Sequence, residues 1–178
     1  RPADAVETAE AWDCALRAEK QPSILCLSRQ ALPTFRTETD EINKVARGAY
    51  LVVEPQDGRD VTLIATGSEV AIALEAARLL EKDDVRVAVV SAPCLELFAK
   101  QTEGYRQAVL GNAPRVVVEA AIEGAWGRLI GDDGEFVGMT GFGASAPANV
   151  LYREFGITSD AVALAAMRSI ARSRIKGA

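Results

Sequence analysis

The chain of 178 residues contains no histidine. Histidine is the commonest general acid or base at neutral pH and a frequent metal ligand. Its absence excludes Ser-His-Asp and Cys-His catalytic sites and His-ligated metal sites within this chain. Any acid–base chemistry here would depend on carboxylates, lysine, tyrosine or a cofactor.

Cysteine is also scarce. Cys14, Cys26 and Cys94 are odd in number and widely spaced, and no Cys-x-x-Cys pair occurs. This pattern favours neither a zinc site nor a disulfide framework, so we expect reduced thiols, mostly in the core, in a cytoplasmic protein. No apolar run approaches the roughly 20 residues that span a bilayer. No leader pattern follows Arg1, and a start without Met fits a trimmed or fragmentary chain.

Positive charge is neither abundant nor clustered. The net charge is −5, and the basic residues are scattered rather than gathered in a stripe. Such a surface repels phosphate backbones on average, which excludes a nucleic-acid partner. It still permits a single arginine to bind one small phosphate. A hydrophobic content of 49% indicates a folded chain rather than a disordered one.

The first part of the chain is expected to hold one helix and one strand. Asp4 and Glu7 have the spacing of a capping box at the start of a helix over Ala3–Ala18. The apolar run Ser23–Ser28 suggests a strand buried on both faces of a parallel sheet. Residues Leu32–Gly48 are polar and irregular, and we interpret them as a linker with at most one helical turn.

From Ala49 onward, strands and helices alternate. This order predicts an α/β fold: a mainly parallel (mixed) open sheet with helices on both faces, preceded by a strand–helix remnant of a neighbouring α/β domain. The expected strands are Tyr50–Glu54, Val61–Ala65, Val85–Val90, Pro114–Glu119 and Glu135–Met139. The expected helices are Thr66–Leu80, Leu95–Phe98, Tyr105–Leu110, Gly124–Ile130, Ala148–Phe155 and Ser159–Ile170.

Two positions could bind an anion. The turn Thr66–Glu69 opens a helix, whose N-terminus attracts negative charge, but its capping-box spacing favours a plain helix cap. Arg29 directly follows the strand predicted at Ser23–Ser28, where its guanidinium could bind a phosphate with two hydrogen bonds. Pairing with a carboxylate such as Glu38 or Glu41 is an equally open alternative.

Three other features have simpler interpretations. The glycine-rich loop Gly138–Pro147 needs special backbone dihedrals and could approach another chain or a ligand. Asp132 and Asp133, flanked by glycines, are typical of a turn. Glu119 ends a buried strand, where a structural role is favoured over a catalytic one. The residues alone therefore predict an α/β domain with possible anion sites and no complete catalytic set.

Four segments, in order and at comparable separations, resemble transketolase. They are Arg1–Asp4, Leu27–Gln30, Ala65–Val70 and Gly141–Pro147, with Arg47–Tyr50 at the expected domain junction. Each is weak alone, but together they are specific and cover essentially the whole chain. The resemblance implies that residues 1–48 end a pyrimidine-binding domain and that residues 49–178 form the C-terminal domain.

Transketolases transfer a two-carbon ketol unit between phosphorylated sugars of the pentose phosphate pathway. They use thiamine diphosphate and a divalent cation, Mg or Ca, and act as homodimers. The resemblance implies that Arg29 binds the sugar phosphate, while the catalytic, cofactor-binding and metal-binding residues lie upstream of Arg1. This segment alone is therefore expected to be inactive and to have the rest of a transketolase chain as its partner.

Two alternatives remain open. One is a non-catalytic α/β module that binds a small anion or a partner protein. The other is a segment of a related enzyme, with dihydroxyacetone synthase as the nearest rival and deoxyxylulose-phosphate synthase sharing the architecture. In a transketolase segment, the first 48 residues would lack sheet neighbours, so we expect an exposed apolar edge around Trp12 and Ile24–Leu27 and a tendency to associate.

Overall fold

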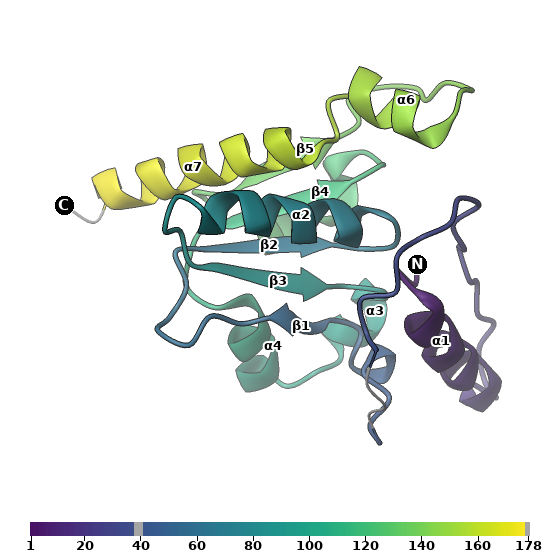
Figure 1. Cartoon of the computed structure of the whole chain (residues 1–178). Helices are drawn as coiled ribbons and strands as arrows, with labels where there is room; N and C mark the ends of the chain where they lie inside the picture. The colour runs from purple at the N-terminus through teal and green to yellow at the C-terminus, as the bar shows by residue number, and fades with distance from the viewer. Residues whose placement is uncertain (38–40, 177–178) are drawn as a thin grey trace.

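A five-stranded sheet lies at the centre of the computed structural model, which describes residues 1–37 and 41–176 (Figure 1). Its strands are β1 (Tyr50–Val53), β2 (Val61–Ala65), β3 (Val87–Ser91), β4 (Arg115–Glu119) and β5 (Glu135–Gly138). Their spatial order is β1-β3-β2-β4-β5. β1 runs antiparallel to β3, and the other three pairings are parallel. The predicted mixed, mainly parallel open sheet is confirmed.

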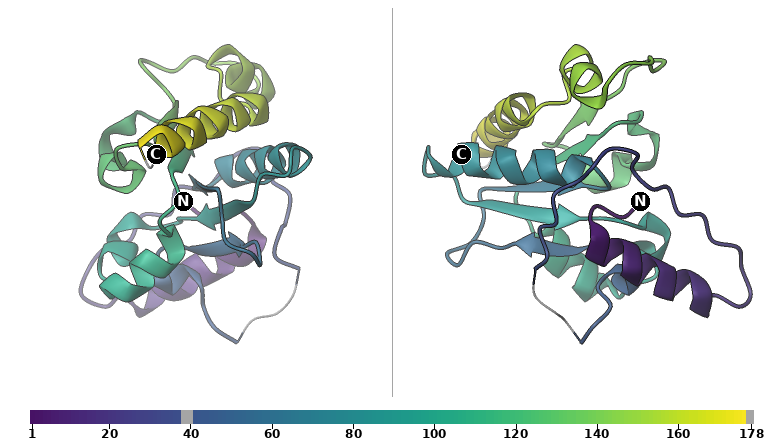
Figure 2. Two further views of the ribbon diagram at one scale, coloured as in Figure 1. Left: turned by 90° about the vertical axis from the view of Figure 1, so that its left-hand side faces the viewer. Right: turned by 45° about the vertical axis from the view of Figure 1, so that its right-hand side comes forward.

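Helices cover both faces of the sheet, as the two views of Figure 2 show. α2 (Glu69–Glu81) and α7 (Ser159–Lys176) pack on one face, and α3 (Leu95–Ala99), α4 (Glu103–Leu110) and α5 (Gly127–Ile130) lie on the other. The remaining elements are α1 (Ala5–Arg17), η1 (Val45–Arg47), η2 (Glu123–Ala125) and α6 (Ala148–Glu154). Each predicted element from Ala49 onward is present, with ends shifted by a few residues.

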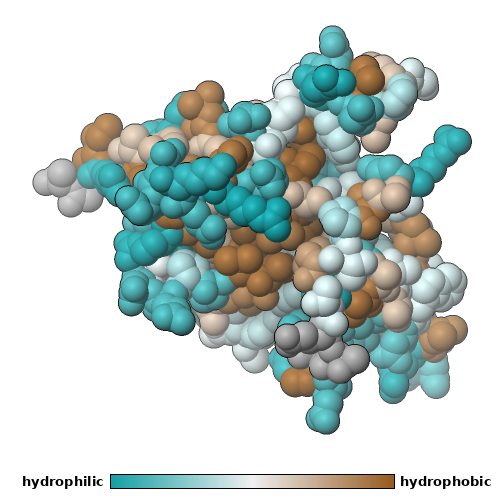
Figure 3. Space-filling model, viewed as in Figure 1, coloured by the Kyte–Doolittle hydropathy of each residue, from teal (hydrophilic) through white to brown (hydrophobic). Residues whose placement is uncertain are grey.

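The three central strands are buried on both faces, which explains their nearly continuous apolar sequences. Alternate residues enter different cores: Leu63 packs with α2 and α7, whereas Ile64 packs with α3, α4 and α5. On the face seen in Figure 1, a hydrophobic area lies beneath α2, where strands β3 and β1 run (Figure 3). Partly buried Phe35 and Val53 pack against the core on the α2 face of the sheet.

The helix predicted at Ala3–Ala18 forms as α1 and begins as expected. The Asp4 carboxylate accepts a hydrogen bond from the backbone N–H of Glu7, at 2.8 Å. The Glu7 carboxylate in turn accepts one from the backbone N–H of Ala3, at 2.6 Å. The linker Leu32–Gly48 contains the expected single turn, η1, and its residues 38–40 lie outside the described part of the chain.

The strand predicted at Ser23–Ser28 is wrong. This segment has no regular secondary structure, and Ile24 and Leu27 are 88% and 53% exposed. It runs past α1, away from the sheet (Figure 2). A strand needs a neighbour for its backbone N–H and C=O groups, and no strand among residues 1–37 and 41–176 pairs with it. The expected exposed apolar edge is present, since Trp12 is also 51% exposed.

Candidate functional site

Arg29 lies in an exposed bend that follows this segment. Among the described residues it forms no ion pair, with Glu41 or any other carboxylate, and Glu38 lies outside the described part of the chain. The guanidinium is therefore not committed to a carboxylate of residues 1–37 and 41–176, and its donors remain available for a ligand.

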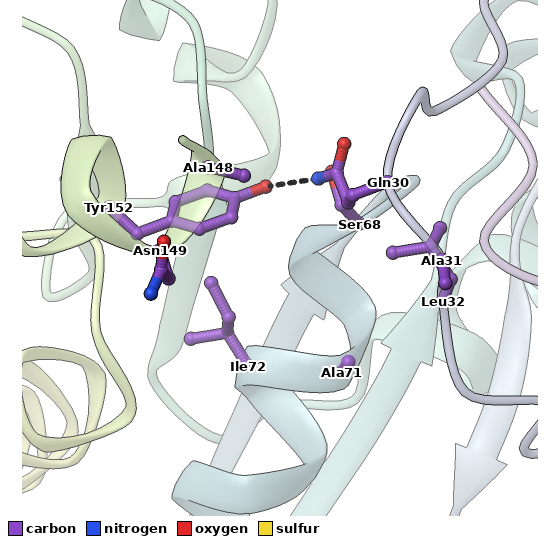
Figure 4. Close-up of a pocket in the computed structure, with 9 residues that line it drawn as sticks. All are labelled: Gln30, Ala31, Leu32, Ser68, Ala71, Ile72, Ala148, Asn149 and Tyr152. Carbon is purple, nitrogen blue, oxygen red and sulfur yellow. Dashed lines mark hydrogen bonds between the residues drawn. The ribbon is translucent and has the colours of Figure 1, made fainter. Parts of the chain in front are cut away.

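A shallow cavity of about 440 Å³ lies beside the next residue, Gln30. It is bounded by the 30–32 segment, the start of α2 and α6, and the Gln30 amide donates to the Tyr152 hydroxyl at 3.4 Å (Figure 4). Its wall is mostly apolar and consists of Gln30, Ala31, Leu32, Ser68, Ala71, Ile72, Ala148, Asn149 and Tyr152. A second depression, of about 230 Å³, is also lined by Gln30, together with Ser28 and residues at the start of α1. Arg29 lies between Ser28 and Gln30 in sequence but lines neither cavity.

The capping box predicted from Thr66 and Glu69 is wrong. The N-cap of α2 is Ser68, and the Thr66 hydroxyl donates instead to the backbone carbonyl of Arg1, at 2.9 Å. The Glu69 carboxylate, fully buried, accepts hydrogen bonds from the Ser68 and Tyr152 hydroxyls, both at 2.7 Å. Burial raises the pKa of Tyr152 to about 12, so this hydroxyl is a donor at neutral pH. The first residue of the helix is itself a buried carboxylate, which disfavours an added anion at this N-terminus.

Arg1 lies between two buried carboxylates. Its Nη2 atom is 2.9 Å from Glu69 Oε2, and its Nη1 atom pairs with Glu119 Oε1. The structural role predicted for Glu119 is thus supported. Sequence reasoning missed the part that Arg1 and Glu69 play here, because residues 1, 69 and 119 meet only in the folded chain.

A second buried carboxylate cluster joins α1 to the sheet. Glu7 Oε1 accepts hydrogen bonds from the Tyr50 hydroxyl at 2.7 Å and from the Ser91 hydroxyl at 2.6 Å. Burial raises the pKa of Glu7, and these hydrogen bonds oppose that shift. Burial also raises the pKa of Tyr50, which keeps its hydroxyl protonated. Since Tyr50 belongs to β1 and Ser91 to β3, Glu7 fixes the start of α1 against that side of the sheet.

The other predicted features lie outside the two hydrophobic cores. The loop after β5 is exposed throughout residues 140–147, including Phe142. Asp132 and Asp133 form the predicted turn, and Asp133 pairs with Lys176. Cys14, Cys26 and Cys94 are free thiols; Cys26 is exposed and the other two are half-buried, so the core placement expected for them is wrong.

Residues of the described chain do not form a metal site of the usual kind, since no three carboxylate, cysteine or histidine side chains cluster suitably. We also find no membrane-spanning candidate among the helices of residues 1–37 and 41–176.

A family model for the transketolase-like TK C-terminal domain matches residues 48–158. The chain belongs to this family. It is 57% identical over 170 residues to a transketolase of Cereibacter sphaeroides, covering 96% of this chain and 26% of the relative. It is 53% identical over 174 residues to a transketolase of Sinorhizobium medicae, with 97% and 25% covered. The resemblance inferred from the four segments is confirmed.

Solved transketolases have the same fold. A transketolase from Leishmania mexicana superimposes with a TM-score of 0.87 at 44% identity, covering 97% of this chain and 25% of the other. A transketolase of Pichia stipitis in complex with sedoheptulose-7-phosphate gives a TM-score of 0.85 at 34% identity, with 98% and 25% covered. The chain thus spans about a quarter of the length of the relatives it matches.

Proposed function

We propose that this chain is the C-terminal segment of a transketolase, which transfers a two-carbon ketol unit between phosphorylated ketose and aldose sugars. The observation that carries the proposal is the match of nearly the whole chain to one quarter of transketolases, at up to 57% identity among the relatives described above. In this proposal residues 1–48 end the pyrimidine-binding domain and residues 49–178 form the C-terminal domain. Alone, the segment is inactive.

The direct contribution of the segment to the reaction is Arg29, which binds the sugar phosphate. Three observations support this role. The side chain is exposed, it pairs with no carboxylate of the described residues, and Ser28 and Gln30 on either side line neighbouring depressions. A guanidinium presents a planar set of donors that suits a phosphate group. The sugar phosphate bound in the Pichia stipitis relative is consistent with such a ligand.

The cofactors belong to the full-length enzyme. Thiamine diphosphate, with Mg or Ca, supplies the carbanion chemistry of ketol transfer when it is bound. The described residues offer no clustered metal ligands, so we assign no cofactor contact and no chemical step to this chain. The second part of its role is structural: apolar side chains such as Leu16, Ile24 and Phe142 are exposed and would pack against the remaining chain or the second subunit of a cytoplasmic homodimer.

Two other functions fit the chain less well, a binding module and a segment of a related enzyme. A non-catalytic module that binds a small anion at the start of α2 is disfavoured, because Glu69 is already placed there. A module that binds a partner protein has no feature of its own that distinguishes it from a segment of a larger enzyme. A segment of dihydroxyacetone synthase would share the architecture, but the high identity to proteins named transketolase favours transketolase.

The test is a ketol-transfer assay on the full-length protein that carries this segment, with the Arg29→Ala variant and phosphorylated and unphosphorylated acceptors. A hydrogen bond to a charged group contributes about 1.5–3 kcal/mol. The value of kcat/KM should therefore fall roughly 10- to 100-fold, and only for phosphorylated sugars. Arg78→Ala is the matched control, since it removes an exposed arginine of α2 whose one ion pair among the described residues is with Glu75 on the same helix. It should leave both rates unchanged.

Two outcomes would contradict parts of the proposal. If the full-length protein transfers ketol units but Arg29→Ala affects both acceptors equally or not at all, the phosphate contact is wrong. If the full-length protein has no ketol-transfer activity with any sugar pair, transketolase function is wrong and a binding module takes its place.

A further inference from the structure

The sheet has one point at which its connections diverge. β2 and β4 are neighbouring parallel strands, and the chain leaves β2 for α2 on one face and β4 for η2 and α5 on the other. In open parallel sheets, ligands bind in the crevice that such a divergence opens at the carboxyl ends of the strands. The side chains at the carboxyl ends of β2 and β4 therefore indicate what this point of the sheet can bind.

Two buried carboxylates lie at this point. Glu69, the first residue of α2, follows β2, and Glu119 is the last residue of β4; they are 0% and 3% exposed. One oxygen of Glu69 accepts from Ser68 and Tyr152. The other oxygen of Glu69, and Oε1 of Glu119, are paired with a cation. Without that cation, two carboxylates at such depth would be strongly destabilising.

The cation is the guanidinium of Arg1. It reaches both carboxylates at once, 2.9 Å from Glu69 Oε2 and paired with Glu119 Oε1. Gly67 provides the room, because a Cβ atom at this position would lie 3.1 Å from Arg1 Nη2. The backbone of Arg1 is held at the same loop: its carbonyl accepts from the Gly67 N–H at 3.1 Å and from the Thr66 hydroxyl at 2.9 Å.

We propose that the carboxylate pair Glu69 and Glu119, at the carboxyl ends of β2 and β4, is a guanidinium-binding site, and that Arg1 occupies it as a latch that holds residues 1–48 on the five-stranded sheet. Both carboxylates repel anions, so the place where related architectures bind small ligands is here used by the chain itself. The latch adjoins the Arg29 segment, because the Tyr152 hydroxyl that donates to Glu69 also accepts from Gln30. The proposal does not depend on the enzymatic activity proposed above.

Chemical rescue in the 178-residue chain tests the site. Arg1→Ala leaves the two carboxylates without their cation, and the melting temperature should fall by roughly 5–10 °C. Guanidinium chloride at about 20 mM, far below the molar concentrations at which it denatures, should restore part of this loss, whereas an equal concentration of sodium chloride should not. The double variant Arg1→Ala/Glu119→Gln, in which one carboxylate is neutral, should melt higher than Arg1→Ala and show little rescue.

Arg17→Ala is the matched control. Arg17 is also an arginine of the first 48 residues, but its side chain is 79% exposed and pairs with Asp13 of the same helix. This variant should melt like the wild-type protein and should not respond to guanidinium. A fall in melting temperature for Arg1→Ala no larger than for Arg17→Ala, or the absence of guanidinium rescue, would overturn the proposed site.

Amide hydrogen exchange separates a latch from general destabilisation. In Arg1→Ala the amides of α1 should exchange at least tenfold faster than in the wild-type protein, while those of β2 and β4 keep their order of protection. Equal acceleration across α1 and the sheet would overturn the latch. Neither experiment measures ketol transfer, so a result that refutes the guanidinium site would not bear on the proposed function.

Discussion

The buried Glu7 cluster leads to a quantitative prediction for Tyr50→Phe. The substitution keeps the aromatic ring and its contact with the guanidinium of Arg36, which lies 5.4 Å from the ring centroid. It removes only the hydroxyl that donates to Glu7. A hydrogen bond to a charged group contributes about 1.5–3 kcal/mol, against about 0.5–1.5 kcal/mol between neutral groups. At about 2–4 °C per kcal/mol for a chain of this size, the melting temperature should fall by roughly 3–12 °C.

Tyr105→Phe is a closely matched control. Its ring also lies beneath an arginine, with the Arg47 guanidinium 5.3 Å from the centroid, but its hydroxyl donates at 2.9 Å to the neutral carbonyl of Ala49. This variant should lose about 0.5–1.5 kcal/mol. Urea unfolding of both variants, with m-values compared, measures the two losses directly.

The pH dependence follows from the raised pKa of Glu7. A carboxyl group whose pKa is raised on folding contributes stability below its ordinary pKa of 4.5, and this contribution is lost as the pH rises through the folded value. Tyr50→Phe removes a donor that favours the charged carboxylate, so it should cost more above the folded pKa of Glu7 than below it. Below pH 4.5 the losses of unfolding free energy caused by Tyr50→Phe and by Tyr105→Phe should become similar. Equal losses at neutral pH, or a difference that does not change with pH, would refute this reasoning.

Two further predictions concern backbone space and a surface ion pair. Gly48→Ala should prevent stable folding, costing about 4 kcal/mol or more, because φ is +82° and the new Cβ would lie 2.1 Å from the Phe98 nitrogen. At Gly104 a new Cβ would meet no atom within 4 Å, so Gly104→Ala should raise stability by up to about 1 kcal/mol in urea unfolding. A stable Gly48→Ala protein would contradict the close approach. Hydrogen bonds from Arg86 hold the pKa of Asp60 at about 2, so its contribution is present above 3.8 and lost as the pH falls towards 2. Asp60→Asn should flatten the acid-induced loss of stability over that interval, and an unchanged acid profile would count against the pair.

Local sequence patterns specified most of the strands and helices from Ala49 onward. The runs around Leu63, Val89 and Val117 are apolar because both faces of those strands are covered, and such runs are visible without a structure. The start of α1 was equally accessible, since Asp4 and Glu7 lie within one helical turn and their contact is local. The family was visible in the sequence too, because its four segments keep their residues and order.

The tertiary structure alone decided the contacts that join distant parts of the chain. The apolar sequence of Ser23–Ser28 predicts a buried strand, but a strand exists only where a neighbour pairs with its backbone, and the described chain offers none. The capping spacing of Thr66 and Glu69 was overridden because Arg1 provides a partner for both side chains. Electrostatic and hydrogen-bonding interactions depend on distance in space, so no spacing in the sequence could have brought residue 1 together with residues 69 and 119.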